Sequence, residues 1–332
     1  MTDQRRALIT GVSGQDGWYL ARQLLARGYS VVGTTHREDS PERLDIDGNR
    51  IPLVLLDLSD MQRIEDVLRK IQPDEIYNFA ARASSAQLFD DPLATADING
   101  VAVGRLLEAI VRGGAPIKFC QASSSEIFAG AELSPQDETT RIAPLSAYGA
   151  AKAFADHLVS AYRSRHDLFA CSAVLYPHES PRRAPHFLVR KVTQAAALIQ
   201  AGVQRGVTLG DLGAVRDWGY APDYVDAMWR MLQASEARDY VIASGRAHSV
   251  REVCEIAFGH VGLDWQAHVV VDGGLTRPPE RVARVGNSAR AEADLAWQPT
   301  VGFRELITEL VDFERSALTS ENRADNGAKR GA

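Results

Sequence analysis

Tyr148 and Lys152 stand four residues apart in a segment whose apolar spacing predicts a helix. Residues four apart share one face of a helix, so the phenol and the ammonium group point the same way. An ammonium group, together with the positive ring of a nicotinamide cofactor, would lower the pKa of the tyrosine and make it a general base near neutral pH. Ser124 ends a predicted strand, where its hydroxyl can hold a substrate oxygen. These residues predict hydride chemistry at a carbon that bears a hydroxyl group.

Glu126 offers chemistry that a simple dehydrogenase does not need. It lies two residues beyond Ser124 and can face the same cleft. A carboxylate in that place could remove a proton from a carbon made acidic by a neighbouring ketone. The alternative is a solvated glutamate that opens the turn at residues 127–130, and the nearby tyrosine–lysine pair favours the catalytic interpretation.

A glycine-rich turn joins the first predicted strand to the first predicted helix. Glycines at this position let backbone N–H groups approach a pyrophosphate at the helix N-terminus. Tight turns also use glycine for steric reasons alone, but the strand–turn–helix context favours the binding interpretation. The candidate cofactor-binding residues of this turn are Gly11, Gly14, Gln15, Asp16 and Gly17.

The end of the second predicted strand distinguishes NAD from NADP. An acidic residue there would bind the ribose 2′-OH, whereas an arginine accommodates a 2′-phosphate. Arg37 stands at this position with no carboxylate before Glu38, which favours NADP; a solvated loop arginine is the alternative. Asp57, just past the third predicted strand, could contact the adenine ring or cap the next helix. Leu58 beside it is also a candidate cofactor contact.

The elements that must position these residues alternate between short apolar runs and helical patterns, which indicates a parallel α/β sheet. We expect strands at residues 6–10, 30–35, 52–56, 75–80, 117–122, 169–175 and 239–243. Helices are expected at residues 16–27, 61–71, 92–112 and 146–166. The prediction is a doubly wound Rossmann sheet whose ligand lies outside the carboxyl ends of the strands.

The regular alternation of predicted strands and helices ends after residue 174. We expect a Rossmann domain at 1–174 plus 212–247, and a smaller mixed α/β substrate domain at 175–211 plus 248–318. Helices at 187–201, 249–259 and 303–315 and strands at 207–209 and 267–271 would build the smaller domain. Residues 319–332 are polar and lack an apolar period, so they are expected to form a disordered tail.

Composition excludes several classes of function. The net charge of −6 disfavours a general nucleic-acid binder. Three separated cysteines, Cys120, Cys171 and Cys254, predict reduced thiols in a cytoplasmic protein. The N-terminus lacks the apolar stretch of a signal peptide, and no run of about twenty apolar residues predicts a membrane span. No metal site is predicted.

The chain resembles the GDP-mannose 4,6-dehydratase family of extended short-chain dehydrogenase/reductases along most of its length. HESPRR and RDWG followed by DYV are specific to this branch. The resembling stretches are ALITGVSGQDGWYL, LDLSD, QPDEIYN, FCQASSSEIF, PQDETT, SAYGAAK, HESPRR, LGDLGAVRDWGYAPDYVDAMWRMLQ, VIASG and HSVRE.

The resemblance implies a redox-neutral reaction on a GDP-sugar, with NADP as a bound catalyst in a homodimer or homotetramer. Tyr148 would take the proton from the sugar O4 as hydride leaves C4. Glu126 would then remove the C5 proton and help to expel the C6 hydroxyl as water, before hydride returns to C6. Ser124 would support O4, and Ser125 would assist near Glu126.

The same matching places charged residues at positions that hold the nucleotide part of the substrate. Diphosphates favour charge-assisted contacts with arginine, and a ribose diol suits a carboxylate. Taken singly, each could instead belong to a surface charge pair. The candidate substrate-binding residues are Glu179, Lys191, Arg216, Arg277 and Glu280.

The chain departs from the family pattern around the sugar and the assembly surfaces. Pro177 replaces an asparagine before HESPRR, and it has neither a side-chain donor nor a backbone N–H. Ala83 and Ser84 replace a serine–histidine pair, and Leu88 replaces a serine. The loop after Arg37 and the region before residue 277 are shorter. The type of reaction is thus better supported than the identity of the sugar.

Other functions stay open at this point. The substrate could be another GDP-hexose or a GDP-heptose, or the chain could be a reductase or epimerase of a nucleotide-linked keto sugar. Glu126 discriminates, because reduction of a 4-keto group needs Tyr148 and Lys152 but no base at C5. A non-catalytic NADP-binding sensor would be expected to lack one of that pair, and both are present.

Overall fold

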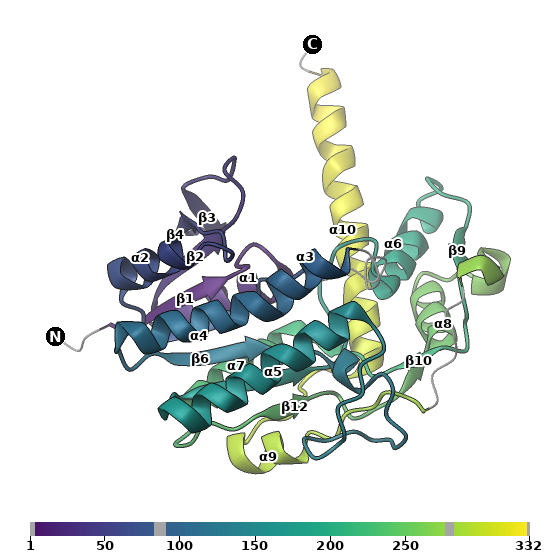
Figure 1. Cartoon of the computed structure of the whole chain (residues 1–332). Coiled ribbons are helices and arrows are strands. Elements are labelled where there is room, and N and C mark those ends of the chain that lie inside the picture. The colour runs from purple at the N-terminus through teal and green to yellow at the C-terminus, as the bar shows by residue number, and fades with distance from the viewer. Residues whose placement is uncertain (1–3, 83–90, 276–281, 331–332) are drawn as a thin grey trace.

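An eight-stranded sheet forms the centre of the chain, whose computed structural model describes residues 4–82, 91–275 and 282–330 (Figure 1). Neighbouring strands follow the order β12-β7-β6-β5-β1-β2-β4-β3, and all pairs are parallel except β3 and β4. The predicted doubly wound α/β sheet is confirmed. Its strands are β1 (Arg6–Thr10), β2 (Ser30–Thr35), β3 (Arg43–Ile46), β4 (Asn49–Leu55), β5 (Glu75–Asn78), β6 (Lys118–Ala122), β7 (Ala170–Leu175) and β12 (Tyr240–Ile242).

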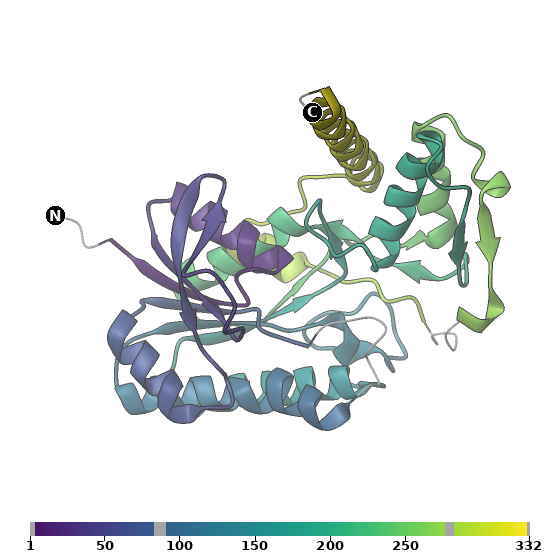
Figure 2. The same ribbon diagram turned by 90° about the horizontal axis from the view of Figure 1, so that it is seen from above.

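Helices cover both faces of this sheet, as the view from above shows (Figure 2). On one face lie α1 (Gln15–Ala26) and α7 (Ala221–Gln233), whose apolar sides share one buried cluster. On the other face lie α2 (Met61–Ile71), α4 (Ala102–Gly113) and α5 (Ala147–His166), which share another. Strands enclosed in this way carry nearly continuous apolar runs, and all six residues of β7 are buried.

The antiparallel hairpin of β3 and β4 is an element that the sequence analysis misses. Asp47 and Gly48 join the two strands, and both adopt positive φ values of 48° and 84°. Two residues with positive φ form the turn that matches the twist of a hairpin, and Asp-Gly is a preferred pair for it. The Asp45 carboxylate also accepts a hydrogen bond from the Gly48 N–H at 3.0 Å. The Asp-Gly pair was therefore an available signal.

The predicted helix at 92–112 is interrupted by one turn of π-helix. It consists of α3 (Pro92–Ala96), η1 (Asp97–Val101) and α4. The π turn contains Asn99, which is buried and bonds both the N–H and the C=O of Arg82, at 2.8 and 3.1 Å. The interruption thus directs one amide side chain to the segment that follows β5.

A third apolar cluster lies beside the sheet and joins α6, α8 and α10. Its members include Val192, Phe258 and Leu310, one from each helix. Short strand pairs flank it, with β8 parallel to β11, β9 parallel to β14, and β10 antiparallel to β13. The elements are β8 (His178–Glu179), α6 (Leu188–Gln200), β9 (Val207–Leu209), β10 (Val215–Arg216), β11 (Gly219–Tyr220), β13 (His248–Ser249), α8 (Val250–His260), η3 (Trp265–Ala267), β14 (Val269–Val271), η4 (Gly273–Leu275) and α10 (Phe303–Arg330).

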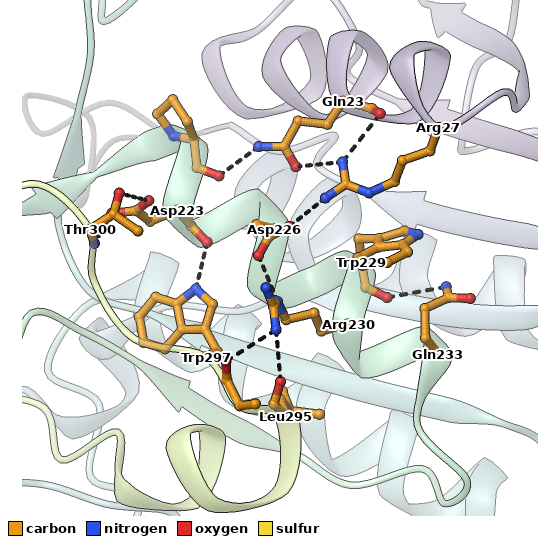
Figure 3. A network of polar contacts seen from close by, with 12 residues as sticks. Gln23, Arg27, Asp223, Asp226, Trp229, Arg230, Gln233, Leu295, Trp297 and Thr300 are labelled. Carbon is orange, nitrogen blue, oxygen red and sulfur yellow. Dashed lines mark hydrogen bonds and ion pairs between the residues drawn. The ribbon is translucent and has the colours of Figure 1, made fainter.

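Residues 289–300 return to the sheet, although the sequence assigns them to the smaller domain. α9 (Ala289–Leu295) and Trp297 pack into the cluster that contains α1 and α7. The Trp297 indole N–H donates to the carbonyl of Asp223 at 2.8 Å (Figure 3). The Asp223 carboxylate accepts from the backbone N–H and the hydroxyl of Thr300, at 2.8 and 2.7 Å. This segment therefore packs with the Rossmann part of the chain.

The last helix, α10, extends to Arg330 and projects from the rest of the chain (Figure 1). Most of residues 319–332, for which the sequence predicts no regular structure, thus continue as helix. No proline interrupts the segment, so nothing in the backbone stops the helix from propagating. Within the described ranges, no helix is both long enough and apolar enough to cross a membrane.

Candidate active site

The carboxyl end of β6 meets the N-terminal end of α5, and the candidate catalytic residues lie at this junction. A single 3₁₀ turn, η2 (Ser125–Phe128), follows β6. The Ser124 hydroxyl caps it by accepting a hydrogen bond from the Glu126 N–H at 3.2 Å. In the same way, the Ser146 hydroxyl caps α5 by accepting from the Gly149 N–H at 3.0 Å. Two side-chain caps thus fix the start of both elements.

Gly149 lets α5 approach η2 closely. A Cβ atom at this position would lie 2.7 Å from the carbonyl oxygen of Glu126. A larger residue would therefore push α5 away from η2 and separate Tyr148 from Glu126.

Ser124, Tyr148 and Lys152 come together at this junction. The Lys152 Nζ donates to the carbonyl oxygen of Ala122 at 2.6 Å and lies 5.8 Å from the centroid of the Tyr148 ring. The Tyr148 hydroxyl lies near that of Ser124, and the interaction between them acts to lower the pKa of Tyr148. Since Lys152 is buried, its ammonium group is held by the end of the strand rather than by water.

The surroundings of Tyr148 in the protein raise its pKa. Burial raises it to about 12, the interaction with the Ser124 hydroxyl opposes this rise, and the charge of Glu126 adds to it. The ammonium group of Lys152 donates to the Ala122 carbonyl rather than to the phenol. The predicted lowering also requires the positive ring of a bound nicotinamide, so it stays a prediction.

Asp156 is a residue of this site that the sequence analysis misses. Its carboxylate accepts a hydrogen bond from the Ser123 hydroxyl, and burial raises its pKa to about 7. Burial also lowers the pKa of Lys152 to about 8, while the charges of Asp156 and Asp16 oppose that shift. Continuing the four-residue spacing from Tyr148 and Lys152 by one step would have found it.

Glu126 forms an ion pair with Arg284, another residue that the sequence analysis misses. The Arg284 Nη1 lies 2.6 Å from the Glu126 Oε1, and the two side chains are 6% and 20% exposed. No local spacing could have indicated this contact, because the residues lie in distant parts of the chain. Ser125, predicted to assist Glu126, is buried in η2.

The glycine turn has the close contacts that a nucleotide-binding turn requires. Gly11 has a φ of +66°, and a Cβ there would lie 2.9 Å from the Ala80 backbone nitrogen. A Cβ on Gly17 would lie 2.6 Å from the Gly11 carbonyl oxygen, so only glycine lets α1 begin this close to β1. Gly14 is the N-cap residue of α1. The residues present fit a pyrophosphate at the amino end of α1.

Gln15 and Asp16 connect this turn to the HESPRR segment. The Gln15 amide oxygen accepts from the Ser180 hydroxyl at 2.7 Å, and its nitrogen donates to the His178 carbonyl at 3.2 Å. The Asp16 Oδ1 lies 2.9 Å from the His178 Nε2. Burial acts to raise the pKa of Asp16, but the His178 pair outweighs it and the net shift is downward. The two side chains therefore link the nucleotide turn to β8.

The three residues predicted to contact the adenosine half differ in accessibility. Arg37 follows β2, is exposed, and makes two hydrogen bonds to the Asp39 carboxylate at 3.1 and 3.0 Å. Asp57 accepts from the Ser59 N–H at 2.8 Å, which lowers the pKa of Asp57. Leu58 is buried in the apolar cluster under α2 and α4, so its side chain belongs to the core.

The predicted substrate-binding residues are spread over the smaller part of the chain. Glu179 is buried, lies 3.5 Å from the Arg183 guanidinium, and has a pKa raised by burial. The Lys191 Nζ donates to the Thr208 carbonyl at 2.7 Å. The Arg216 Nη1 donates to the carbonyl of its neighbour Val215 at 2.6 Å. The other two candidates, Arg277 and Glu280, lie outside the described residues.

Four departures from the family pattern were named by residue, and of these Pro177 lies in the described part of the chain. It lies between β7 and β8, and its carbonyl accepts from the Gly219 N–H at 2.9 Å. Its missing N–H therefore does not disturb the pairing of β8 with β11. Ala83, Ser84 and Leu88 lie outside the described residues.

The glycine turn and the tyrosine–lysine face lie at carboxyl ends of strands in one doubly wound sheet. This arrangement defines the extended short-chain dehydrogenase/reductase class. The family model described as GDP-mannose 4,6 dehydratase matches residues 8–310. The chain belongs to the GDP-mannose 4,6-dehydratase family.

Individual relatives cover nearly the whole chain. The Arabidopsis thaliana protein named GDP-mannose 4,6 dehydratase 1 is 42% identical over 320 residues, covering 92% of this chain and 88% of the relative. The Homo sapiens GDP-mannose 4,6 dehydratase is 40% identical over 348 residues, covering 96% and 93%. Among solved structures, the complex of the Thermus thermophilus UDP-glucose 4-epimerase with NAD has a TM-score of 0.80 at 28% identity, covering 94% of this chain and 99% of that chain.

Proposed function

We propose that this chain is an NADP-dependent GDP-mannose 4,6-dehydratase that forms GDP-4-dehydro-6-deoxy-mannose. The observation that carries the proposal is the position of Glu126, which lies in η2 two residues beyond Ser124 and close enough to Tyr148 for its charge to raise the pKa of the phenol. A group suited to O4 and a carboxylate suited to C5 thus share one junction. The names and high coverage of the relatives support the same activity.

The residues of this junction divide the reaction between them. When bound, the nicotinamide would accept hydride from C4 of the sugar and later supply it to C6. Tyr148 would take the O4 proton, with Ser124 holding that oxygen. Lys152 would keep a positive charge near the phenol and favour its ionised form. Glu126 would remove the C5 proton as the C6–O bond breaks, and would help the C6 hydroxyl to leave. Over one cycle the O4 proton and the C6 hydroxide leave as water, and a proton returns to C5.

The preference for NADP rests on Arg37. Arg37 lies two residues after the end of β2, and its exposed guanidinium is accessible to a 2′-phosphate. We expect Arg37→Ala to weaken NADP binding by about tenfold, the loss of one charge-assisted contact, and to leave NAD binding unchanged. Arg43→Ala, at another exposed arginine of this edge, is the control. Equal weakening for both cofactors would contradict the assignment of Arg37 to the 2′-phosphate.

The remaining candidates are proposed to bind the cofactor and the GDP part of the substrate. Gly11, Gly14 and Gly17 would hold the pyrophosphate of the cofactor, with Gln15 and Asp16 beside it, and Asp57 and Leu58 would lie at its adenosine half. Lys191, Arg216, Arg277 and Glu280 would hold the GDP part of the substrate. Glu179 would act through Arg183, since its own carboxylate is buried against that guanidinium.

The organisation of the chain is proposed as a Rossmann domain (1–174 plus 212–247) and a substrate domain (175–211 plus 248–318). The separate apolar cluster of α6, α8 and α10 supports this division, apart from residues 289–300. A homodimer or homotetramer is supported by the exposed apolar side chains of Leu93, Val101 and Phe154 on α3, η1 and α5. A cytoplasmic location is supported by three buried, unpaired cysteines.

Incubation of the purified protein with GDP-mannose and catalytic NADP tests the activity. We expect a product that has lost one water and carries a 4-keto group, without net accumulation of NADPH. A panel of GDP-, UDP-, CDP- and dTDP-sugars identifies the preferred substrate. Absence of a dehydrated product across the whole panel would overturn the proposal.

A second candidate is the same reaction on another GDP-hexose or a GDP-heptose. Pro177 favours it, because this residue lacks the side-chain amide that the family has before HESPRR. The same panel decides, since this alternative predicts faster turnover of such a sugar than of GDP-mannose.

A further inference from the structure

Arg284 reaches the candidate base Glu126 from a segment that is itself firmly held. The segment pairs with Gln136: the Gln136 N–H donates to the Val285 carbonyl at 2.8 Å, and the Asn287 N–H donates to the Gln136 carbonyl at 2.7 Å. The fully buried Gln136 side chain also accepts from the Val285 N–H at 3.1 Å. The backbone on the C-terminal side of Arg284 is therefore fixed by an interior residue.

Gly286 fastens the same segment to the sheet. Its N–H donates to the Asp217 carboxylate at 3.1 Å, and the same carboxylate also accepts from the Ser244 and Gly245 N–H groups at 2.9 Å each. A Cβ on Gly286 would overlap the side chain of Ala243, the residue that follows β12. The segment thus packs closely against the carboxyl end of the sheet, and these contacts fix the place from which Arg284 reaches Glu126.

We propose that Arg284 is a positioning residue that orients the Glu126 carboxylate toward C5 of the sugar. The inference rests on the proposed function, in which Glu126 is the base at C5. The 2.6 Å contact between the Arg284 Nη1 and the Glu126 Oε1 fixes one carboxylate oxygen, while the other would face C5.

Arg284→Gln tests the proposal, with Arg284→Lys as the conservative variant. Turnover is measured for GDP-mannose and for GDP-mannose deuterated at C5, and enzyme-bound NADPH is followed by absorbance. We expect Arg284→Gln to lower turnover by about 10- to 100-fold and to increase the C5 isotope effect, because a misplaced base slows removal of the C5 proton. Bound NADPH should accumulate transiently, because oxidation at C4 does not use Glu126. Arg284→Lys should restore part of the rate.

Arg290→Gln is the matched control, because Arg290 pairs with Glu138 in the same part of the chain, at 3.5 Å, away from Tyr148 and Lys152. A C5 isotope effect in Arg284→Gln equal to that of the wild type would overturn the proposal, even if the rate fell. Inactivity of the wild type itself would instead count against the proposed function. In that case a double-mutant cycle of Arg284→Met and Glu126→Gln in thermal unfolding still tests the pair, and additive effects would show that the two residues are not coupled.

Discussion

The two sides of the candidate site are built in different ways. On the redox side, Tyr148 and Lys152 lie on one face of α5 and contact the end of β6, so one strand and one helix supply the chemistry. On the elimination side, Glu126 is held by Arg284, which a distant segment brings to the site. The geometry of the redox side is therefore set by the core of the sheet. The geometry of the elimination side depends in addition on the segment that carries Arg284.

The charges on the two sides are controlled differently as well. Burial shifts the pKa values of Tyr148 and Lys152 to about 12 and about 8, toward the neutral forms. Glu126 instead has a cationic partner in direct contact. Burial moves buried acids and bases toward their neutral forms. The comparison indicates that burial governs the groups proposed to act at O4, whereas an ion pair orients the carboxylate proposed to act at C5.

Tyr148→Phe should have the largest effect, since it removes the group that takes the O4 proton. Both oxidation and elimination are expected to fall by about 10²- to 10⁴-fold. Product formation and bound NADPH are measured together. Tyr162→Phe is the control. Tyr162 lies on the same helix, and its hydroxyl donates to Glu108 at 2.8 Å. A variant that still forms NADPH at the wild-type rate would contradict the role of Tyr148.

Glu126→Gln should impair the elimination side and leave the redox side intact. Elimination is expected to fall by a similar factor of about 10²- to 10⁴-fold, while cofactor binding and the first hydride transfer persist. Rapid mixing with GDP-mannose, monitored for bound NADPH, separates the two steps. An unchanged rate of water loss would remove Glu126 from the mechanism.

Gly149→Ala should affect both sides together, because its Cβ would lie 2.7 Å from the Glu126 carbonyl oxygen. Overpacking of this kind typically costs about 1–3 kcal/mol of stability. We expect a lower melting temperature and a lower turnover. Gly113→Ala is the control, since a Cβ there meets no atom within 4 Å at the end of α4. Equal stability of the two variants would show that the approach of α5 to η2 is not tight.

Asp156→Asn should give the smallest effect and should act on the redox side. The negative charge of Asp156 supports the protonated form of Lys152, whose pKa is about 8. Without that charge, Lys152 loses its proton at lower pH, so the basic limb of the turnover profile should move downward. The shift is expected to be about one pH unit or less, and the rate at about pH 6.5 should change little. A basic limb that stays in place would exclude this influence of Asp156.

Much of the fold was predictable because its signals are local. The strands and helices of the sheet follow from hydrophobic periodicity, and each predicted strand of the sheet occurs within a few residues of its expected place. The β3–β4 hairpin was missed although Asp47 and Gly48 signal it. The return of residues 289–300 could not be foreseen, because contacts such as that of Trp297 with Asp223 join parts of the chain that no spacing relates.

In the candidate site, too, local spacing identifies some residues and misses those brought in by long-range contacts. Ser124, Tyr148 and Lys152 were found from spacing because one strand and one helix carry them. Arg284 was not, since its contact is made only by the folded chain. Spacing also places Lys152 near the Tyr148 ring but does not reveal that its Nζ binds the Ala122 carbonyl.

The two outer strands of the sheet also determine where copies of the chain can meet. At one edge, the N–H groups of Val241 and Ala243 donate to the side chains of Glu138 and Ser288, at 2.8 and 2.9 Å. At the other edge, β3 is short and carries the charged residues Arg43 and Asp45. Occupied donors and charged edge strands both discourage the addition of a further strand. Sheet extension and strand-mediated aggregation are thus disfavoured, and self-association is left to the helical faces.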